Sequence, residues 1–330
     1  MNAMRLVEPA LQIENLTTVF ELRAGTVRSV SDVSLSVAPG EIVGLVGESG
    51  SGKSVTGLSV MGLIDAPGRV AEGRIRLNGR DIAGLPEREM RRLRAREVSM
   101  IFQDPMTTLN PVVTIGRQFY EVLRASGGIT WRESQDRARD ALAEVGIPSP
   151  AERLRAYPHE LSGGMRQRVC IALSLICGAR VVIADEPTTA LDVTIQSQIL
   201  HMMQGLVADR GMALVWITHD LSVVAGLCDR VAVMYGGRLV EDGPTAEVLP
   251  RPAHPYTRGL LDSIPVEEGR RGRLRQIPGT QPSPLALPEG CAFRTRCAWA
   301  QDACHSAPPL EGVGPARRAR CHFPYPERPS

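Results

Sequence analysis

Eight residues near the start of the chain, Gly47 to Ser54 (GESGSGKS), match the pattern G-x-x-x-x-G-K-[ST] at every fixed position. They follow an apolar, strand-like run (Ile42 to Val46) and precede a helix-like run (Val55 to Ile64), the context that a phosphate-binding loop requires. Glycines let backbone N–H groups turn toward phosphates, and the helix that follows offers its positive end to them. We therefore predict a nucleotide-binding loop here; a Gly- and Ser-rich turn that matches by chance is the alternative.

Two side chains of this loop carry the chemistry that we expect. Lys53 would contact the β- and γ-phosphates of a nucleotide, and the hydroxyl of Ser54 would bind Mg²⁺. Lys53 is the only lysine of the chain, and the other strongly basic side chains are all arginines. A planar guanidinium cannot replace a compact ammonium in a tight phosphate loop. The loop residues expected to contact the nucleotide are Gly47, Ser49, Gly50, Ser51, Gly52, Lys53 and Ser54.

Two adjacent acids follow a short, wholly apolar run from Val181 to Ala184. Such a run is typical of a central parallel strand buried on both faces, and ligands bind at the carboxyl edge of sheets of this kind. Asp185 is suited to holding Mg²⁺ through water, and Glu186 is suited to orienting and deprotonating an attacking water. Unpaired carboxylates at the end of a buried strand are costly, which favours a functional role for the pair.

Two further polar residues end strand-like runs. Gln103 follows the run from Val98 to Phe102 and has the chemistry to bind Mg²⁺ or to position a water; an ordinary turn residue is the alternative. His219 follows the buried run from Ala213 to Thr218. It closes a second strand–helix unit at the same sheet edge, so a catalytic role and a structural role both stay open.

Two other features have a plain structural alternative. Phe20 is the only aromatic residue before the phosphate loop, and it is either a ring that stacks on a base or a phenylalanine of an edge strand. Ser162 is placed to cap a helix, and Gly163 and Gly164 would leave bare N–H groups that can bind a phosphate. A Gly-containing helix start with no ligand is the alternative.

The elements that must position these residues indicate an α/β fold. Residues from about 11 to 46 alternate as short strands, and residues from about 104 to 178 are mainly helical. Ser134 is expected to cap one of these helices. From Gly243 the chain becomes Pro-rich with little apolar periodicity. We therefore predict a nucleotide-binding domain over residues 1–244, with its helical subdomain, and a C-terminal extension over 245–330.

Composition limits the function classes. A chain of 330 residues can hold a core of about 200–250 residues and a smaller extension. The net charge of +2 gives no general electrostatic argument for nucleic acid. Neither a run of membrane-spanning length nor a signal peptide is evident. We therefore expect a soluble, cytoplasmic protein whose contact with a membrane, if any, is made through a partner.

Taken together in their order, the motifs resemble the ATP-binding subunits of ABC transporters, over nearly all of the chain. The set comprises the phosphate loop, Gln103, the signature LSGGMRQR (161–168), Asp185 with Glu186, the TALD segment ending at Asp192, and His219. The resemblance implies a P-loop NTPase (RecA-like) core with an antiparallel β subdomain and an α-helical subdomain. Each motif except the phosphate loop is weak alone, but six in order leave little room for chance.

The resemblance also implies roles and partners. Glu186 would be the general base, His219 would contact the γ-phosphate, and Phe20 would stack on the base of ATP. Ser162 and Gly164 would contact the γ-phosphate of ATP held by a second ABC ATPase subunit, so one chain carries two half-sites. Gly163 and Asp192 are also expected among the nucleotide-binding residues. A paralogous subunit, forming a heterodimer, is the expected partner. Two transmembrane permease subunits and an extracytoplasmic substrate-binding protein would complete the machine.

Within this family the chain resembles the dipeptide and oligopeptide importer ATPases, and their D-type subunit more than the F-type. This rests on FQDPMTTLNP (102–111), HPYTRGLL (254–261) and a cysteine-bearing tail. Peptide import is thus the predicted function. Nickel or glutathione importers use similar ATPases and stay open as alternatives, as does a soluble, non-transport ABC ATPase. The latter usually has two fused cassettes or a coiled coil, neither of which is evident here.

Four cysteines crowd the C-terminal end in the spacing C-x₅-C-x₆-C-x₁₆-C, at Cys291, Cys297, Cys304 and Cys321. The spacing matches neither a zinc ribbon nor a ferredoxin, so a four-thiolate metal site and plain reduced cysteines are both open. The resemblance favours the [4Fe–4S] cluster found in some peptide-importer ATPases, with zinc as the alternative. Neighbouring arginines would offset the negative charge of such a cluster: Arg294, Arg296, Arg317, Arg318 and Arg320.

Overall fold

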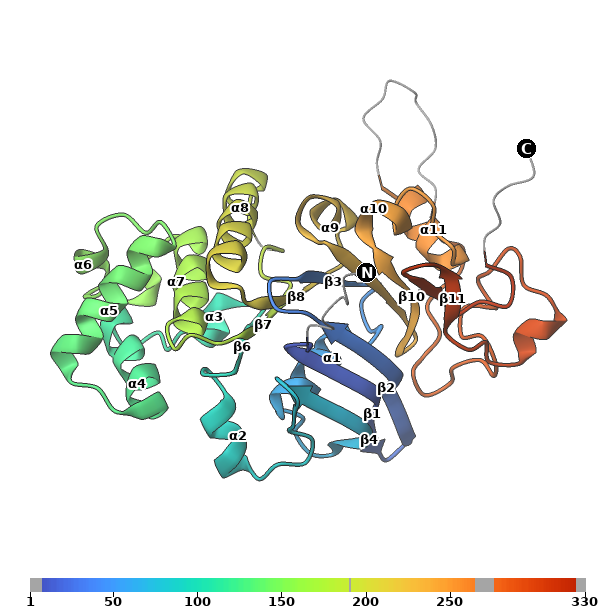
Figure 1. Cartoon of the computed structure of the whole chain (residues 1–330), viewed down its shortest axis with the longest axis horizontal. Helices are drawn as coiled ribbons and strands as arrows, with labels where there is room; N and C mark the ends of the chain where they lie inside the picture. Colours follow the sequence, from blue (N-terminus) through green and yellow to red (C-terminus); the bar gives the residue numbers. More distant parts are fainter. Residues whose placement is uncertain (1–7, 190, 265–275, 325–330) are drawn as a thin grey trace, which may run out of the picture. The chain divides into compact units, whose positions relative to one another are not determined.

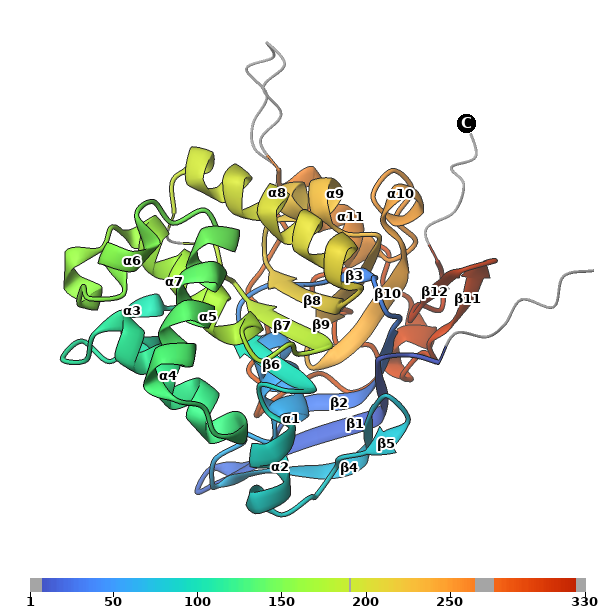
Figure 2. The ribbon, with the colours of Figure 1, turned by 60° about the vertical axis from the view of Figure 1, so that its left-hand side comes forward.

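The computed structural model describes residues 8–189, 191–264 and 276–324. The chain divides into two units. The first unit comprises Met1–Leu11, Ser36–Glu41 and Arg76–Trp216, and the second unit comprises Gln12–Leu35, Ile42–Ile75 and Ile217–Ser330. Figures 1 and 2 show the ribbon from two sides.

Strands and helices alternate through most of the described residues. The strands are β1 (Leu11–Leu22), β2 (Gly25–Val37), β3 (Ile42–Val46), β4 (Gly68–Leu77), β5 (Arg80–Asp81), β6 (Val98–Ile101), β7 (Val181–Asp185), β8 (Ala213–Thr218), β9 (Arg230–Tyr235), β10 (Arg238–Pro244), β11 (Glu311–Gly314) and β12 (Arg317–Ala319). The helices are α1 (Lys53–Met61), α2 (Glu87–Leu93), α3 (Pro105–Thr108), α4 (Ile115–Gly127), α5 (Trp131–Glu144), α6 (Pro150–Arg153), α7 (Gly163–Leu175), α8 (Val193–Arg210), α9 (Leu221–Leu227), α10 (Thr245–Val248) and α11 (Pro255–Asp262). Two 3₁₀ turns, η1 (Pro158–Glu160) and η2 (Asp302–His305), complete the described elements.

The second unit places the phosphate loop at the end of a buried strand. Its strands follow the order β11-β12-β10-β9-β3, and β3 runs parallel to β9 with Val43 opposite Arg230 and Val46 opposite Val233. All five residues of β3 are buried, as an apolar strand with neighbours on both faces requires. The position of the first loop residue is therefore fixed by the buried strand that precedes it.

Strands β9 and β10 form a hairpin. The two strands pair antiparallel, with Tyr235 opposite Arg238, and the turn between them is Gly236–Gly237. Both glycines have positive φ angles, 54° and 79°, which only glycine adopts without strain. The C-terminal segment extends this sheet, because β12 pairs with β10 through Ala319 opposite Glu241.

The first unit holds the acidic pair at the end of a second buried strand. β7 lies between β6 and β8 and runs parallel to β6, with Val98 opposite Val181 and Ile101 opposite Ala184 (Figure 2). All residues of β6 and β7 are buried. Parallel pairing brings the carboxyl ends of both strands, and hence the residues that follow them, to one edge.

The helices of the first unit include the predicted helical region, where α4, α5, α6 and α7 form one group (Figure 1). The expected cap of α5 is wrong by four residues. Thr130, not Ser134, caps the helix, and Thr130 and Glu133 form a reciprocal capping box. Ser134 lies inside the first turn, where its hydroxyl donates to the carbonyl of Trp131. Within the three described ranges, no helix has the length and apolar character to span a bilayer.

Candidate nucleotide-binding site

The phosphate loop is shaped by close backbone approaches at its glycines. A Cβ on Gly47 would lie 2.2 Å from the carbonyl oxygen of Met234, and a Cβ on Gly52 would lie 2.4 Å from that of Ser29. Gly52 also has a φ of 103° and stands immediately before α1. No residue with a side chain fits either position without moving backbone, so both glycines are required by packing and not only by flexibility.

Lys53 is buried, with 5% of its surface exposed, and its ammonium reaches back across the loop. Nζ donates to the carbonyl oxygens of Gly47 (2.8 Å) and Glu48 (3.0 Å). The ammonium carries a full positive charge, whereas these two carbonyl acceptors are neutral. An anionic phosphate is the chemistry that such a site is suited to receive.

Three other loop features fit an anion. The hydroxyl of Ser51 is buried and has no hydrogen-bond partner among the described residues. The first turn of α1 contains no acidic side chain, so its positive end is not neutralised from within the helix. Ser54 lies half-buried in that turn. The loop therefore offers an orphan hydroxyl, a buried cation and a helix start to a phosphate group.

Glu186 and Gln103 lie together in the first unit. The carboxylate of Glu186 accepts hydrogen bonds from Gln103 Nε2 (3.4 Å) and Thr189 Oγ1 (3.0 Å). Glu186 has a φ of 45°, which is uncommon for a residue other than glycine and is found preferentially at functional sites. Asp185, one residue earlier, is 7% exposed at the end of β7. The parallel pairing of β6 and β7 explains why residues 83 positions apart meet.

The signature and the TALD segment also meet in the first unit. Ser162 caps α7, its Oγ accepting from the N–H of Met165 at 3.3 Å, and Asp192 caps α8 in the same way through Ile195 at 2.9 Å. A Cβ on Gly164 would lie 2.9 Å from the side chain of Ile195. The two helix starts thus lie close together at Gly164, and Gly163 beside it is exposed, which leaves first-turn N–H groups available to a ligand.

His219 and Phe20 lie in the second unit. His219 is exposed directly after β8, and the next residue, Asp220, caps α9 by accepting from the N–H of Ser222 at 2.8 Å. Phe20 lies in β1, and its ring is so close to Gly68 that a Cβ there would stand 2.5 Å from Cε1. The ring is half-buried against the start of β4. Its role as a base-stacking residue stays a prediction.

One contributor to the loop was not predicted from the sequence. Tyr256, on α11, is fully buried, and its hydroxyl accepts the backbone N–H of Glu48 at 2.8 Å. The segment HPYT marked a family resemblance in the sequence, but nothing in its pattern indicates contact with a loop 208 positions earlier. Its apolar ring and polar tip are the only local signal, since a buried tyrosine hydroxyl requires a partner.

The four terminal cysteines line a single pocket together with His254, Arg294 and His322. The thiols of Cys291, Cys297 and Cys321 each accept a hydrogen bond from the backbone N–H two residues downstream. Burial raises the pKa of all three thiols, that of Cys321 to about 11. Within the described residues, however, no group of three or more His, Cys, Asp or Glu side chains has the arrangement to hold a metal ion. The predicted metal site thus has no support from ligand geometry.

The neighbouring arginines do not surround these cysteines as expected. Arg296 pairs with Glu48, Arg317 with Glu241, Arg318 with Asp242 and Arg320 with Asp32. Each partner lies outside the cysteine segment. Of the five, Arg294 is the one that lines the cysteine pocket. Most of this charge therefore binds the C-terminal segment to the rest of the second unit.

Comparison with known proteins fits this geometry. Residues 30–189 match the model of the ABC transporter family, and residues 240–304 match that of the oligopeptide/dipeptide transporter C-terminal region. One relative is a protein of Brucella abortus (strain 2308) whose name describes it as an inferred peptide import ATP-binding protein. It is 52% identical to this chain, over 95% of this chain and 97% of its own length. The chain belongs to the ABC transporter family. As an ABC ATPase subunit it has the α/β, P-loop fold predicted from the sequence.

Two further matches cover different shares of this ABC ATPase. The oligopeptide transport ATP-binding protein OppD of Salmonella typhimurium (strain LT2) is 46% identical over 96% of this chain and 94% of its own. The dimeric structure of MJ0796, a bacterial ABC transporter cassette, matches with a TM-score of 0.64 at 25% identity, over 71% of this chain and 98% of that one. The cassette fold is therefore shared with solved ABC structures, and the sequence relationship reaches into the C-terminal segment.

Proposed function

We propose that this ABC ATPase subunit powers the import of dipeptides or oligopeptides. The observation that carries the proposal is the presence, in one chain, of the phosphate loop and of a C-terminal segment that matches the oligopeptide/dipeptide transporter region. The 46–52% identity to peptide-import ATP-binding proteins over almost the whole chain supports the same cargo. The subunit would lie on the cytoplasmic side of the membrane, attached through permease subunits.

The chemistry assigned to the site is ATP hydrolysis. Lys53 and the loop N–H groups would bind the phosphates, and Ser54, Gln103 and Asp185 would hold Mg²⁺, which neutralises phosphate charge when bound. Glu186 would take the proton from the attacking water, as its hydrogen bond with Gln103 supports. The other assignments follow the family resemblance: His219 to the γ-phosphate, Phe20 to the base.

A second ATPase subunit is part of this proposal. Ser162, Gly163, Gly164 and Asp192 would contact ATP bound to the phosphate loop of that subunit. The exposed N–H groups at the start of α7, next to the capped start of α8, support an external anionic ligand there. A paralogous chain, two permeases and an extracytoplasmic binding protein would complete the importer. The division into a cassette (1–244) and an extension (245–330) is retained as part of the proposal.

Transport of a defined cargo tests the function. The complete importer, with its binding protein, would be placed in proteoliposomes containing ATP, and uptake of a labelled tripeptide, Ni²⁺ and glutathione would be compared. We expect ATP-dependent uptake of the peptide only, lost when this chain carries Lys53→Ala. Uptake of Ni²⁺ or glutathione in place of peptide would refute the proposed cargo but would leave the proposed ATPase activity unchanged.

For the cysteine pocket we propose a [4Fe–4S] cluster bound by Cys291, Cys297, Cys304 and Cys321. The support is that all four line one pocket and that three accept N–H···S hydrogen bonds, which stabilise thiolates. A cluster with one thiolate on each iron separates its ligands more than a single ion does, which is compatible with the lack of a single-ion arrangement.

Metal analysis decides the occupant of the pocket. Anaerobically purified chain should be brown and contain about four iron and four sulfide per chain. The variant Cys304→Ser should lose the colour, whereas Cys177→Ser, outside the pocket, should retain it. Stoichiometric zinc without colour would assign the pocket to zinc, and metal-free protein would leave four reduced thiols.

A further inference from the structure

The second residue of the phosphate loop, Glu48, is bound by an arginine that comes from the far end of the chain. Arg296 Nη1 and Nη2 donate to the two carboxylate oxygens of Glu48 at 2.6 and 3.0 Å. This is a bidentate pair, the strongest geometry for these groups. The side chain of Arg296 is 5% exposed and that of Glu48 is 29% exposed, so the pair is only partly screened by water.

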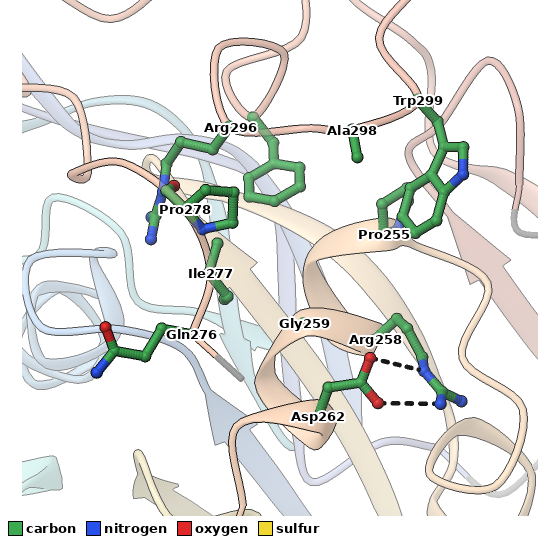
Figure 3. A pocket seen from close by; sticks show the side chains of 11 residues that line it. Pro255, Arg258, Gly259, Asp262, Gln276, Ile277, Pro278, Arg296, Ala298 and Trp299 are labelled. Atoms are coloured by element: carbon green, nitrogen blue, oxygen red, sulfur yellow. Dashed lines mark hydrogen bonds and ion pairs between the residues drawn. The ribbon is translucent and has the colours of Figure 1, made fainter. Parts of the chain in front are cut away.

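The guanidinium of Arg296 also forms hydrogen bonds with groups other than Glu48. Arg296 Nε donates to the carbonyl oxygen of Pro278 at 3.0 Å, and Nη1 lies 3.4 Å from the hydroxyl of Tyr235. In Figure 3, Arg296 and Trp299 stand on opposite sides of a pocket, with Pro278 beside Arg296. Hydrogen bonds at Nε and at both terminal nitrogens fix the orientation of the group, which lysine, with a single nitrogen, cannot reproduce.

Glu48 is the residue through which this contact reaches the phosphate site. Its backbone N–H donates to Tyr256, its carboxylate pairs with Arg296, and its carbonyl oxygen accepts from Lys53 Nζ at 3.0 Å. Tyr256 is held in turn by the ring of Tyr235, with centroids 4.6 Å apart. Every polar group of Glu48 is therefore bound, and its carbonyl helps to place the ammonium that the loop uses for phosphate.

We propose that Arg296 is a positioning residue for nucleotide binding, which makes the C-terminal segment part of the phosphate site. It holds the Glu48 carboxylate away from the loop mouth and keeps the Glu48 carbonyl where Lys53 needs it. Without Arg296, the freed carboxylate is a competing anion for the same ammonium and repels the phosphates of the nucleotide. The proposal rests on the proposed function in that the loop binds ATP.

The chain supplies a matched control. Arg320, like Arg296, directly precedes one of the four cysteines and forms a half-exposed ion pair, with Asp32 of β2 at 3.0 Å. It also donates to three backbone carbonyls, of Leu239, Pro308 and Asp32. Loss of Arg320 removes a comparable tie between the C-terminal segment and the second unit without touching the phosphate loop.

Equilibrium binding of ATP to the full-length chain tests the proposal. Arg296→Met should raise the Kd for MgATP about tenfold, whereas Arg320→Met should change it less than about twofold. Adding Glu48→Gln to Arg296→Met removes the freed charge and should return the Kd to within about threefold of the wild-type value. Arg296→Lys, which retains the charge but not the bidentate bond, should give an intermediate Kd.

Three results would overturn the inference. They are unchanged ATP affinity in Arg296→Met, equal weakening by Arg320→Met, or a double variant no better than Arg296→Met. The first two assign Arg296 to general stability, which the unfolding temperature of each variant reports independently. If Arg296→Met does not fold, the comparison of Arg296→Lys with and without Glu48→Gln decides the question. A wild-type chain that binds no ATP would instead refute the proposed function.

Discussion

At the scale of single residues, the phosphate loop depends on a buried ammonium that backbone carbonyls hold in place. Lys53 Nζ has two backbone carbonyls as acceptors at 2.8 and 3.0 Å and is 5% exposed. In a site of low exposure a positive charge is costly, and an arriving phosphate places a negative charge beside it. Binding energy and loop geometry therefore depend on the same side chain.

Lys53→Ala should raise the Kd for ATP by at least about tenfold, since a charge-assisted contact to phosphate is lost. Lys53→Arg should also impair binding, because a guanidinium does not fit between the carbonyls of Gly47 and Glu48. Fluorescence titration with a labelled nucleotide measures both. Wild-type affinity in either variant would contradict the assignment of the loop.

The backbone strain of Glu186 and its side-chain contacts both favour a functional role for this residue. Its φ of 45° places it outside the usual region, and Gln103 and Thr189 hold its carboxylate. An isosteric glutamine can keep the contact with Thr189 but cannot take up a proton. The two functions of the side chain, structure and base, are therefore separable.

Glu186→Gln should lower kcat for ATP hydrolysis by about 10²- to 10⁴-fold while leaving the Kd for ATP nearly unchanged. Steady-state hydrolysis and equilibrium binding, measured in parallel, check this. Glu144→Gln is the control, since Glu144 pairs with Arg210 on the surface of the first unit. Turnover close to wild type in Glu186→Gln would remove Glu186 as the base.

At the scale of elements, helix starts organise much of the site. α7, α8 and α9 are capped by Ser162, Asp192 and Asp220, each of which accepts a backbone N–H from the first turn. Capping leaves the other first-turn N–H groups directed out of the helix, where the resemblance places phosphate contacts. Local sequence rules identify such starts well when one cap residue stands alone, as Ser162 does.

The cap of α11 makes this part of the structure sensitive to pH. His254 is 1% exposed, its Nδ1 accepts the N–H of Tyr256, and burial lowers its pKa to about 3. In the unfolded chain the pKa of histidine is about 6.5, so between these values the unfolded state binds the additional proton. The free energy of unfolding therefore falls as the pH drops below about 6.5.

His254→Asn keeps a capping acceptor and removes the titration. Below pH 6.5 the free energy of unfolding of the wild type should fall by up to about 1.4 kcal/mol for each pH unit. Between pH 7 and pH 5 the free energy of unfolding of His254→Asn should fall by less. Urea unfolding at both pH values measures the difference. His201→Asn, at an exposed position of α8, should keep the wild-type slope. An equal slope in His254→Asn and the wild type would show that His254 is not the titrating group.

At the scale of the whole molecule, the proposal gives the chain half of each of two ATP sites. The matched structure of MJ0796 is dimeric, and the signature helix of this chain leaves N–H groups exposed at Gly163. A chain without its partner then lacks groups that the transition state needs. Hydrolysis should therefore depend on association.

The isolated chain should hydrolyse ATP slowly, and addition of its partner ATPase should raise turnover at least about tenfold. With Glu186→Gln in place, ATP should convert the mixture to a stable dimer, detected by sedimentation velocity, and ADP should not. Rapid hydrolysis by a monomer, independent of protein concentration, would refute the shared-site model. The variant Ser162→Arg should abolish the stimulation without preventing ATP binding to Lys53.

The sequence by itself determined those parts of the site that lie within one short stretch. The phosphate loop, the acids after β7 and the cap at Ser162 depend on spacing between near neighbours, and spacing is visible in the sequence. Their order along the chain then identified the family. The prediction of a cap at Ser134 was wrong, because Thr130, four residues earlier, caps α5 through its reciprocal bonds with Glu133.

Only the tertiary structure decided which distant side chains meet. Arg296 pairs with Glu48 across 248 positions, and four of five arginines expected around the cysteines pair with carboxylates elsewhere in the second unit. Among 38 basic and 36 acidic residues, any arginine has many possible partners at similar Coulomb energy. The path of the chain, set by burial of apolar strands such as β3 and β9, selects one of them.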